Sequence, residues 1–497
     1  MRVSRSLLLA LLVSAALPAC PGIAQETTTA EYRQQGEAEL ASRVAASERP
    51  DRARNVIIFV GDGMGVSTLT AARILAGQAA SRDGESNVTA MDLLDHTALV
   101  KTYSHDGQVA DSAPTATAIL AGVKTRNSVI GLGPEAMVDD CPSGLANQVP
   151  SLLGMAQDAG FATGIVTTTT ITHATPAAGY AHTPQRDWES DAKMPKIAQQ
   201  HGCIDIARQL VEGPVGKRLD VALGGGRSSF LPATVIDPEY ADRTGQRQDG
   251  RDLIAAWRRA NPSGIFAWNA KQLSELGRDS GARLLGLFEP GHMQFEADRA
   301  ADRGGEPSLA DMVEVSIHRL AQDGKGYLLL VEGGRIDHAH HGGNAYRALT
   351  DAAAFDDAVA RALGLVDLDN TLIVTTADHS HTLTMSGYPM RGNPILGTVA
   401  FGKPQLARDG KAYTTLGYAN GPGATATGER SDPAIENTMA TDYRQQALVP
   451  LSSETHGGED VIVRASGPGA DLFRGTIEQH TIFYIIRQAL FGDAPQG

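Results

Sequence analysis

Positive charge is scarce in this sequence. The 497 residues include 43 lysines and arginines against 57 aspartates and glutamates, which gives a formal net charge of -14 at pH 7. Because binding to nucleic acid needs a basic surface, this balance argues against a nucleic acid as partner. Aromatic residues are also few, at 5%, whereas the 54 glycines are typical of a loop-rich α/β protein.

Long apolar runs are absent beyond the N-terminus. No segment after residue 24 supplies the roughly 20 uninterrupted apolar residues that cross a bilayer. At the N-terminus, two arginines precede the apolar stretch Leu7–Leu17, and this order predicts an export signal over residues 1–24. Cleavage after Ala24 would release a soluble periplasmic or extracellular protein. Alternatively, Leu17–Cys20 resembles a lipoprotein box, which would place a lipid anchor at Cys20.

Cysteine is scarce as well. Of three cysteines, Cys20 belongs to the predicted leader, which leaves Cys141 and Cys203 as an even pair. In an exported protein such a pair favours a disulfide, with two free buried thiols as the alternative.

The remaining sequence alternates apolar runs with amphipathic stretches. After a polar arm, residues 25–52, which is either helical or disordered, the runs predict strands at Asn55–Val60, Ala98–Tyr103, Phe161–Thr167, Leu219–Leu223, Tyr327–Val331, Thr371–Thr376 and Val461–Ala465. The amphipathic stretches predict helices at Ser112–Gly122, Ser151–Ala159, Ile204–Val211, Leu309–Ala321, Ala345–Leu363 and Glu478–Leu490. This alternation indicates a mostly parallel sheet with helices on both faces. Within one unit over residues 53–490, the Gly-, Pro- and Thr-rich residues 382–450 predict an insertion that lies on the core.

One segment, Val331–His341, holds a Glu, an Asp and three His residues directly after an apolar run. Burying such a cluster is unfavourable unless a cation organises it. Asp337 and His341 lie four residues apart, so on a helical turn both side chains face one side, as two ligands of one zinc ion would. Glu332, at the strand end, is expected to reach a second ion. A solvated charged loop is the alternative.

Other predicted strands are also followed by polar residues. These residues are Asp62, Thr175, Asp378 and His379. In open α/β sheets the functional site lies beyond the carboxyl ends of the strands, so we expect these side chains to converge on one edge. Taken singly, each of them is more typical of a turn or a capped loop.

A candidate nucleophile, Ser112, lies in the stretch A-D-S-A-P-T-A-T-A at the start of a predicted helix. A Ser or Asp at this place is by default an N-cap. The same position would set the hydroxyl beside backbone N–H groups and the positive end of the helix dipole, which favour a phosphoryl group. Both interpretations stay open on the residues alone.

Six motifs occur in the order seen in alkaline phosphatases, which the chain resembles over roughly residues 50–490. The motifs are D-G-M-G, D-S-A-x-T-A-T-A, T-H-A-T-P, V-E-G-G-R-I-D-H-x-H-H, T-A-D-H-S-H and E-T-H-G-G-E-D. The chain looks closest to the animal-type branch, because His173 and His338 stand where the best-known bacterial enzyme type has Asp and Lys. The resemblance implies a three-layer α/β/α sandwich with a mostly parallel central sheet and a crown-like insertion.

The resemblance also implies a role for each matched residue. The implied ligands of one zinc ion are Asp337, His341 and His456. Those of a second zinc ion are Asp62, Asp378 and His379, with Ser112 completing the set. Those of a magnesium ion are Asp62, Thr175 and Glu332. Arg186 would clamp phosphate as a bidentate guanidinium fork, with His173 and His338 near it.

Further features follow from the same resemblance. The calcium site of the animal-type branch maps onto Glu239, Phe288 and Glu289, with Glu306 standing in for an Asp. The pair Cys141 and Cys203 matches a family disulfide. A homodimer with the insertion at its interface is implied as well.

The activity implied is metal-dependent hydrolysis of phosphate monoesters through a phosphoserine at Ser112. A phosphodiesterase or sulfatase of the same superfamily is an alternative, although sulfatases need C/S-x-P-x-R and this chain has Ala116 in place of the Arg. A non-catalytic metal- or phosphate-binding export protein is another alternative. Such a protein has no need for Ser112 at a helix start or for Arg186.

Overall fold

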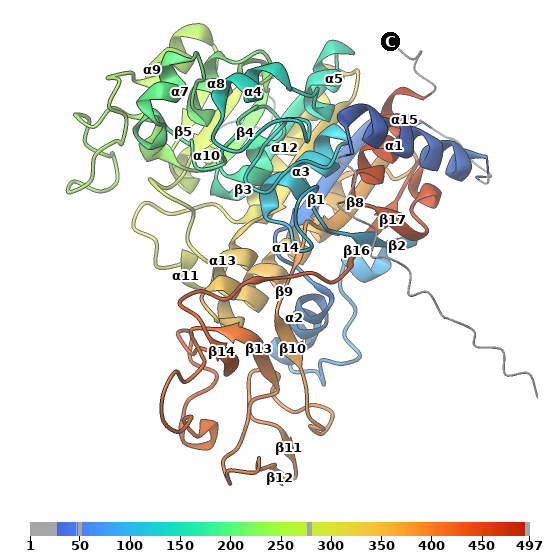
Figure 1. The fold of residues 1–497 in the computed structure, drawn as a ribbon, viewed down its shortest axis with the longest axis vertical. Coiled ribbons are helices and arrows are strands. Elements are labelled where there is room, and N and C mark those ends of the chain that lie inside the picture. Colours follow the sequence, from blue (N-terminus) through green and yellow to red (C-terminus); the bar gives the residue numbers. More distant parts are fainter. Residues whose placement is uncertain (1–26, 46, 48–51, 276–280, 493–497) are drawn as a thin grey trace, which may run out of the picture.

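The computed structural model describes residues 27–45, 47, 52–275 and 281–492. Within these residues the largest element is a ten-stranded sheet that runs through the body of the molecule (Figure 1). The predicted leader with Cys20 and part of the polar arm lie outside the described residues. None of the described helices is long and apolar enough to cross a membrane.

The central sheet is parallel except for one strand. Its strands, in spatial order, are β17 (Gly475–Glu478), β2 (His96–Lys101), β16 (Val461–Ser466), β8 (Thr371–Ala377), β1 (Asn55–Gly61), β7 (Tyr327–Gly333), β3 (Ala162–Thr170), β4 (Val221–Gly225), β6 (Leu284–Leu287) and β5 (Ile265–Ala267). Only β16 runs antiparallel to its neighbours. The central strands β7 and β8 are buried along their whole length, which explains their unbroken apolar runs.

Helices cover both faces of the sheet and complete the predicted three layers (Figure 1). On one face lie α12 (Leu309–Leu320), α14 (Ala345–Leu365) and, against α14, α2 (Val66–Ala79). On the other lie α3 (Ser112–Ala121), α5 (Leu152–Asp158) and α15 (Thr481–Phe491). Shorter helices are α4 (Cys141–Ala146), α6 (Ala174–Ala177), α7 (Lys196–Gln200), α8 (Ile206–Glu212), α9 (Leu253–Ala260), α10 (Ala270–Glu275), α11 (Glu296–Arg299) and α13 (Arg335–His341).

Part of the polar arm is a helix, α1 (Thr29–Val44), that packs on α15 of the same chain. A capping box at Thr28 starts the helix, with Glu31 as its reciprocal partner. Gly36 permits the close approach, because a Cβ there would lie 2.0 Å from the Tyr484 ring. The helical alternative for the arm is thus the correct one for these residues.

All predicted strands and helices are present, with ends shifted by a few residues. The predicted helix start at Glu478 is wrong, since Glu478 ends β17 and α15 begins at Thr481. The short strands β5, β6 and β17 were not predicted. Each has only three or four residues, too few for a periodic pattern.

Residues 382–450 project from one end of the central sheet (Figure 1). They contain a small sheet of β10 (Leu383–Met385), β13 (Leu416–Gly421) and β14 (Ala447–Pro450), and a hairpin of β11 (Ala400–Phe401) and β12 (Lys403–Pro404). Next to this segment, β9 (Ser380–His381) pairs antiparallel with β15 (His456–Gly457).

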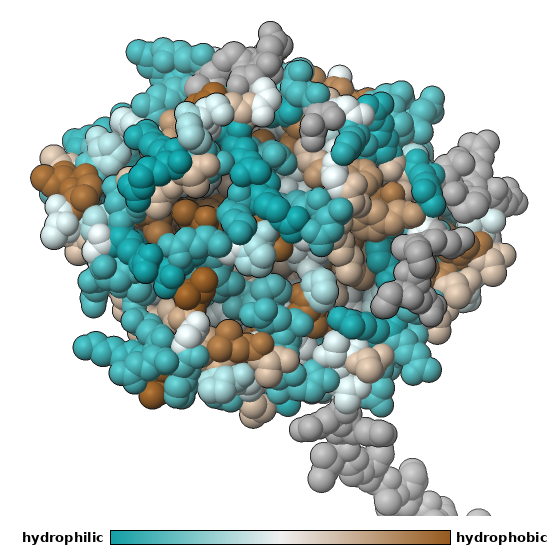
Figure 2. Space-filling model, turned by 90° about the horizontal axis from the view of Figure 1, so that it is seen from above, coloured by the Kyte–Doolittle hydropathy of each residue, from teal (hydrophilic) through white to brown (hydrophobic). Residues whose placement is uncertain are grey.

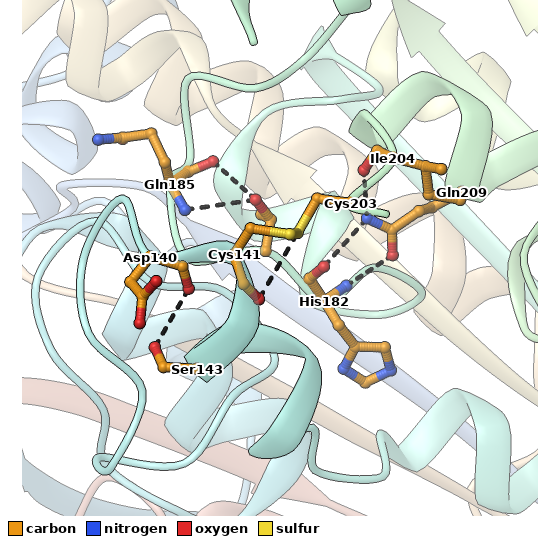
Figure 3. Close-up of a disulfide and its surroundings, with 9 residues drawn as sticks. Asp140, Cys141, Ser143, His182, Gln185, Cys203, Ile204 and Gln209 are labelled. Atoms are coloured by element: carbon orange, nitrogen blue, oxygen red, sulfur yellow. Dashed lines mark hydrogen bonds between the residues drawn. A yellow bond between two sulfur atoms is a disulfide. The ribbon is translucent and has the colours of Figure 1, made fainter. Parts of the chain in front are cut away.

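The expected disulfide joins Cys141, at the start of α4, to Cys203, after α7. Figure 3 shows the bridge beside His182 and Gln209, which exchange hydrogen bonds through the Gln209 amide at 2.9 and 3.0 Å. The alternative of two free thiols is therefore wrong.

Replacing both cysteines by serine should lower the stability of the protein. The bridge closes a loop with a sequence separation of 62 residues, and the entropy of such a loop is worth about 4 kcal/mol in the unfolded chain. Under non-reducing conditions, Cys141→Ser/Cys203→Ser should unfold with a midpoint at a lower urea concentration than the parent protein. An unchanged midpoint would contradict a stabilising role for the bridge.

Candidate functional site

Three neighbouring strands bring acidic residues to one edge of the sheet. The ends of β1, β7 and β8 lie side by side, because Gly61 pairs with both Gly333 and Ala377. Asp62 and Asp378 directly follow β1 and β8, and Glu332 is the penultimate residue of β7. The predicted convergence at the carboxyl edge is therefore present.

A first group consists of Asp337, His341, His381 and His456, whose ligand atoms lie within 4.8 Å of one another. The three imidazole Nε2 atoms face Asp337 Oδ1, at 2.7 Å from His381, 3.3 Å from His456 and 3.4 Å from His341. Helix α13 presents Asp337 and His341 one turn apart, whereas the pairing of β9 with β15 sets His381 opposite His456.

Asp337 is ionised in spite of its burial. Although desolvation opposes the charge, hydrogen bonds from His381 and His456 hold the pKa of Asp337 well below its usual value. Burial likewise opposes the charge of His381, but hydrogen bonds to Asp337 and Glu454 raise the pKa of His381 to about 9. A carboxylate surrounded by imidazole nitrogens is a ligand set that suits zinc.

A second group consists of Asp62, Asp378 and His379. His379 Nε2 lies 3.4 Å from Asp62 Oδ1 and 3.3 Å from Asp378 Oδ2. The backbone N–H groups of Gly63 and His379 donate to Asp378 Oδ1 at 2.9 and 2.8 Å, which fixes this carboxylate. Burial lowers the pKa of His379 well below its usual value, so the ring is neutral, as a metal ligand must be.

Ser112 contacts the second group and does not cap its own helix. Asp111 is the N-cap of α3, and its side chain accepts a hydrogen bond from Ala113 N at 2.8 Å. The Ser112 Oγ is therefore free to contact Asp62 Oδ1 at 3.3 Å and His379 Nε2 at 3.2 Å. Of the two interpretations of this stretch, the N-cap belongs to Asp111, and Ser112 faces the acidic edge.

A third group, Asp62, His173 and Glu332, shares Asp62 with the second. Asp62 Oδ2 and Glu332 Oε1 are buried without a hydrogen-bond partner among the described residues. Thr167 donates to the other Glu332 oxygen, Oε2, and the Thr175 hydroxyl lies beside this carboxylate. Free carboxylate oxygens next to a hydroxyl are the hard donors that magnesium prefers.

The second and third groups hold an excess of buried negative charge. Burial raises the pKa of Asp62 well above its usual value, and the nearby carboxylates of Asp378, Asp337 and Glu332 raise it further. Burial also raises the pKa of Glu332 and of Asp378. Such a set is unfavourable to bury without cations, so the donor chemistry fits bound divalent metal ions.

Arg186 lies between the nucleophile candidate and a buried histidine. Its Nη1 is 3.6 Å from Asp111 Oδ1, beside Ser112, and its Nη2 donates to His173 Nε2 at 3.0 Å. The Arg186 side chain is 19% exposed, whereas Ser112 is 1% exposed. The guanidinium therefore borders solvent at the place where an anion would approach the serine.

Three histidine rings pack next to Arg186 in edge-to-face and tilted contacts. The ring centroids of His173 and His338 are 5.4 Å apart, and His292 lies 4.3 Å from His338. Arg335 donates to His338 Nδ1 at 2.8 Å, and a backbone N–H donates to His292 Nδ1 at 3.0 Å. Both rings are therefore held as neutral imidazoles.

Of the four predicted calcium residues, Glu239 and Glu289 lie in a separate acidic cluster, together with Asp302, which was not predicted. Both oxygens of Glu306 instead accept the backbone N–H of Gln294, at 3.1 and 2.9 Å. Burial raises the pKa of Glu306 to about 9. Phe288, also predicted here, is buried in the core directly before Glu289.

Three residues of these clusters were not predicted from the sequence. His381 follows His379 by two residues in T-A-D-H-S-H, and the alternation of an extended chain was its only signal. His292 and Asp302 lie in loops, where no period could point to them.

Comparison with known proteins identifies the family. Residues 53–491 match the family model described as alkaline phosphatase. The chain belongs to the alkaline phosphatase family. The tissue-nonspecific alkaline phosphatase isozyme of Gallus gallus is 46% identical over 459 residues, which cover 91% of this chain and 87% of that protein. An alkaline phosphatase of Gadus morhua is 45% identical over 438 residues, covering 87% and 90%.

Solved structures of alkaline phosphatases share the fold. The enzyme from Thermus thermophilus matches with a TM-score of 0.64 at 26% identity, over 89% of this chain and 92% of that chain. The enzyme from the Antarctic bacterium TAB5 matches with a TM-score of 0.62 at 22% identity, over 89% and 100%. These findings confirm the predicted family, its animal-type resemblance, the α/β fold and an enzyme that hydrolyses phosphate monoesters with the help of metal ions.

Removing the cations should destabilise the protein more strongly as the pH rises. Without metal, the folded pKa values of Asp62, Glu332 and Asp378 are raised. These groups then contribute their full stability below pH about 4, and this contribution is lost as the pH rises through their raised pKa values in the folded state. Thermal unfolding with and without chelator should differ more at pH about 8.5 than at pH about 5.5. An equal or smaller difference at the higher pH would contradict cation binding among these carboxylates.

Proposed function

We propose that this enzyme hydrolyses phosphate monoesters with Ser112 as nucleophile. The proposal is based on the position of the Ser112 Oγ. Asp111, and not Ser112, caps the helix, and the Ser112 Oγ faces Asp62 and His379 at 3.3 and 3.2 Å. The Oγ would attack phosphorus as the bond to the alcohol breaks, forming a phosphoserine. Water would then cleave the phosphoserine, releasing inorganic phosphate and restoring Ser112.

The donor atoms of each group of ligands indicate which cation that group would bind. We assign one zinc ion to Asp337, His341 and His456, a second to Asp62, Asp378 and His379, and magnesium to Asp62, Thr175 and Glu332. When bound, the cations would polarise the phosphate oxygens and favour the alkoxide of Ser112. Asp62, as a member of two groups, would link the second zinc ion to the magnesium ion.

Arg186 would bind the phosphoryl oxygens. Asp111, which caps α3 and accepts the Ser128 N–H at 2.7 Å, holds the Arg186 guanidinium next to Ser112. A guanidinium fork can donate to two oxygens of one phosphate at once. His173, which accepts from Arg186, would set its orientation, with His338 packed behind.

The substrates that the protein hydrolyses distinguish the proposed activity from the rival activities. A sulfatase or phosphodiesterase would act mainly on aryl sulfates or diesters, and a binding protein would hold zinc without turnover. Hydrolysis of an aryl phosphate, a bis-aryl phosphate and an aryl sulfate by the purified protein should be dominated by the monoester. Dominant turnover of either of the other two would contradict the proposal.

Ser112→Ala should lose roughly 1,000-fold or more of the turnover, because no other nucleophile replaces the hydroxyl. Binding of inorganic phosphate should persist, since Arg186 and the cation ligands stay in place. Acid-quenched wild-type protein should carry phosphate from a labelled monoester, and Ser112→Ala should carry none. Ser274→Ala, an exposed serine on α10, serves as the matched control. Near wild-type turnover of Ser112→Ala would refute the phosphoserine route.

We also propose a fourth cation, calcium, at the acidic cluster of Glu239 and Glu289. The third carboxylate there is Asp302, whose oxygens are buried without a hydrogen-bond donor among the described residues. Burial and Glu239 raise the pKa of Glu289 to about 7, a sign of excess negative charge. Hard oxygen donors of this kind suit calcium.

A second copy of this chain is the proposed partner. Apolar side chains of residues 382–450 are strongly exposed: Tyr388 84%, Phe401 67%, Leu406 63%, Ile435 87% and Leu448 81%. Figure 2 views the opposite end of the molecule, which is mainly hydrophilic with apolar residues in small separate groups. An apolar surface of this kind is typical of an interface. Export to the periplasm or the extracellular space, with or without a lipid at Cys20, completes the proposal.

Ile435→Asp combined with Leu448→Asp should shift the protein from dimer to monomer in light scattering, because each change places a charge in the proposed interface. Val88→Asp with Leu93→Asp is the matched control, since these residues are 62% and 68% exposed but lie outside the insertion. A wild-type protein that is a fully active monomer would contradict the dimer.

A further inference from the structure

A buried carboxylate, Glu454, connects most of the first group of ligands. Glu454 is 1% exposed and lies two residues before His456, in the segment that follows the insertion. It belongs to none of the ligand groups described above. Its side chain and its main chain nevertheless contact two of the three histidines in the group around Asp337.

Both carboxylate oxygens of Glu454 accept hydrogen bonds. Its Oε1 accepts the N–H of Thr382 at 2.7 Å and the Thr382 hydroxyl at 2.6 Å. Its Oε2 accepts the Nδ1–H of His381 at 2.5 Å. His381 Nε2, on the far side of the ring, lies 2.7 Å from Asp337 Oδ1. Glu454 thus fixes both the tilt of the His381 ring and the nitrogen that faces Asp337.

The main chain of Glu454 holds a second histidine in the same manner. Its carbonyl accepts the Nδ1–H of His341 at 2.6 Å, and its N–H donates to the His341 carbonyl at 3.0 Å. The third histidine, His456, donates its Nδ1–H to Ala110 O at 2.8 Å. Each of the three rings therefore has Nδ1 on a protein acceptor and Nε2 toward Asp337, and Glu454 supplies two of the three acceptors.

This arrangement decides which nitrogen is available to a cation. A carbonyl or carboxylate oxygen only accepts, so Nδ1 of each ring carries a proton. Nε2 of His341 and of His456 is the nitrogen left to bind a cation, whereas Nε2 of His381 donates a hydrogen bond to Asp337. Acceptors of this kind around a metal orient the ligand imidazoles and make them stronger ligands. Glu459, in the same segment, makes no such contact, since its Oε1 accepts the Ser380 hydroxyl at 2.7 Å.

We propose that Glu454 is the positioning residue of the Asp337 cation site: its main chain directs Nε2 of His341 at the metal ion, and its carboxylate holds His381 against Asp337. The inference rests on the proposed function, because it assumes a zinc ion at Asp337. It adds a residue outside the ligand set and assigns His381 to the surroundings of the same ion.

Glu454→Gln tests the inference with almost no change in volume. The two donors of Thr382 would keep the amide oxygen, so the amide NH₂ would face His381 Nδ1. An NH₂ group only donates, so His381 would lose its Nδ1 proton, and with it the acceptor that fixes the ring, while Nε2–H still faces Asp337. Zinc titration against a competing chelator should show one of two zinc sites weakened about 10- to 100-fold. ¹⁵N NMR of the histidine rings should show one ring that has lost its Nδ1 proton and keeps a proton on Nε2.

Glu459→Gln is the matched control, since it removes the same charge from the same segment. It should bind both zinc ions with wild-type affinity. Thermal unfolding of metal-free Glu454→Gln checks that the variant is folded. A folded Glu454→Gln with wild-type zinc affinity and an unchanged ring tautomer overturns the inference, as does an equal loss of affinity in Glu459→Gln. A wild-type protein without two zinc sites would instead overturn the proposed function.

Discussion

Mutual repulsion among buried carboxylates at one edge of the sheet governs both the candidate site and the stability of the fold around it. Parallel strands in register deliver Asp62, Glu332 and Asp378 to adjacent positions, where burial raises the pKa of each carboxylate. Water cannot stabilise charges at this depth, so cations between the carboxylates should stabilise the folded chain. Metal ions bound by these side chains would stabilise the folded chain as well as activate a substrate.

Much of the fold could be predicted because its central strands are buried on both faces. Such strands read as unbroken apolar runs, and their polar ends mark the functional edge, as β1, β7 and β8 illustrate. The boundary near Glu478 was misplaced for a physical reason. Glu478 pairs with Lys101 and Lys124 at the end of β17, and this tertiary contact outweighs its preference for a helix.

In the candidate site, too, some residues could be predicted from the sequence and others could not. Asp337 and His341 were found because a helical turn gives them a recognisable spacing, and the residues after strands were found because topology gathers them. His381 and Glu454 could not be placed, since their meeting depends on the pairing of β9 with β15 and on a chain segment that returns after the insertion. The capping role of Asp111 was equally hidden, because both Asp111 and Ser112 suit a helix start and only backbone geometry separates them.

The proposed site holds three divalent cations at this edge, with Asp62 between two of them. X-ray diffraction from crystals of the metal-loaded protein, recorded on both sides of the zinc absorption edge, tests it most directly. The expected result is a zinc peak in the group around Asp337, another in the group of Asp62, Asp378 and His379, and a lighter ion without zinc signal beside Thr175 and Glu332. A single zinc peak, or zinc bound away from these side chains, would show that the assignment of the cations is wrong.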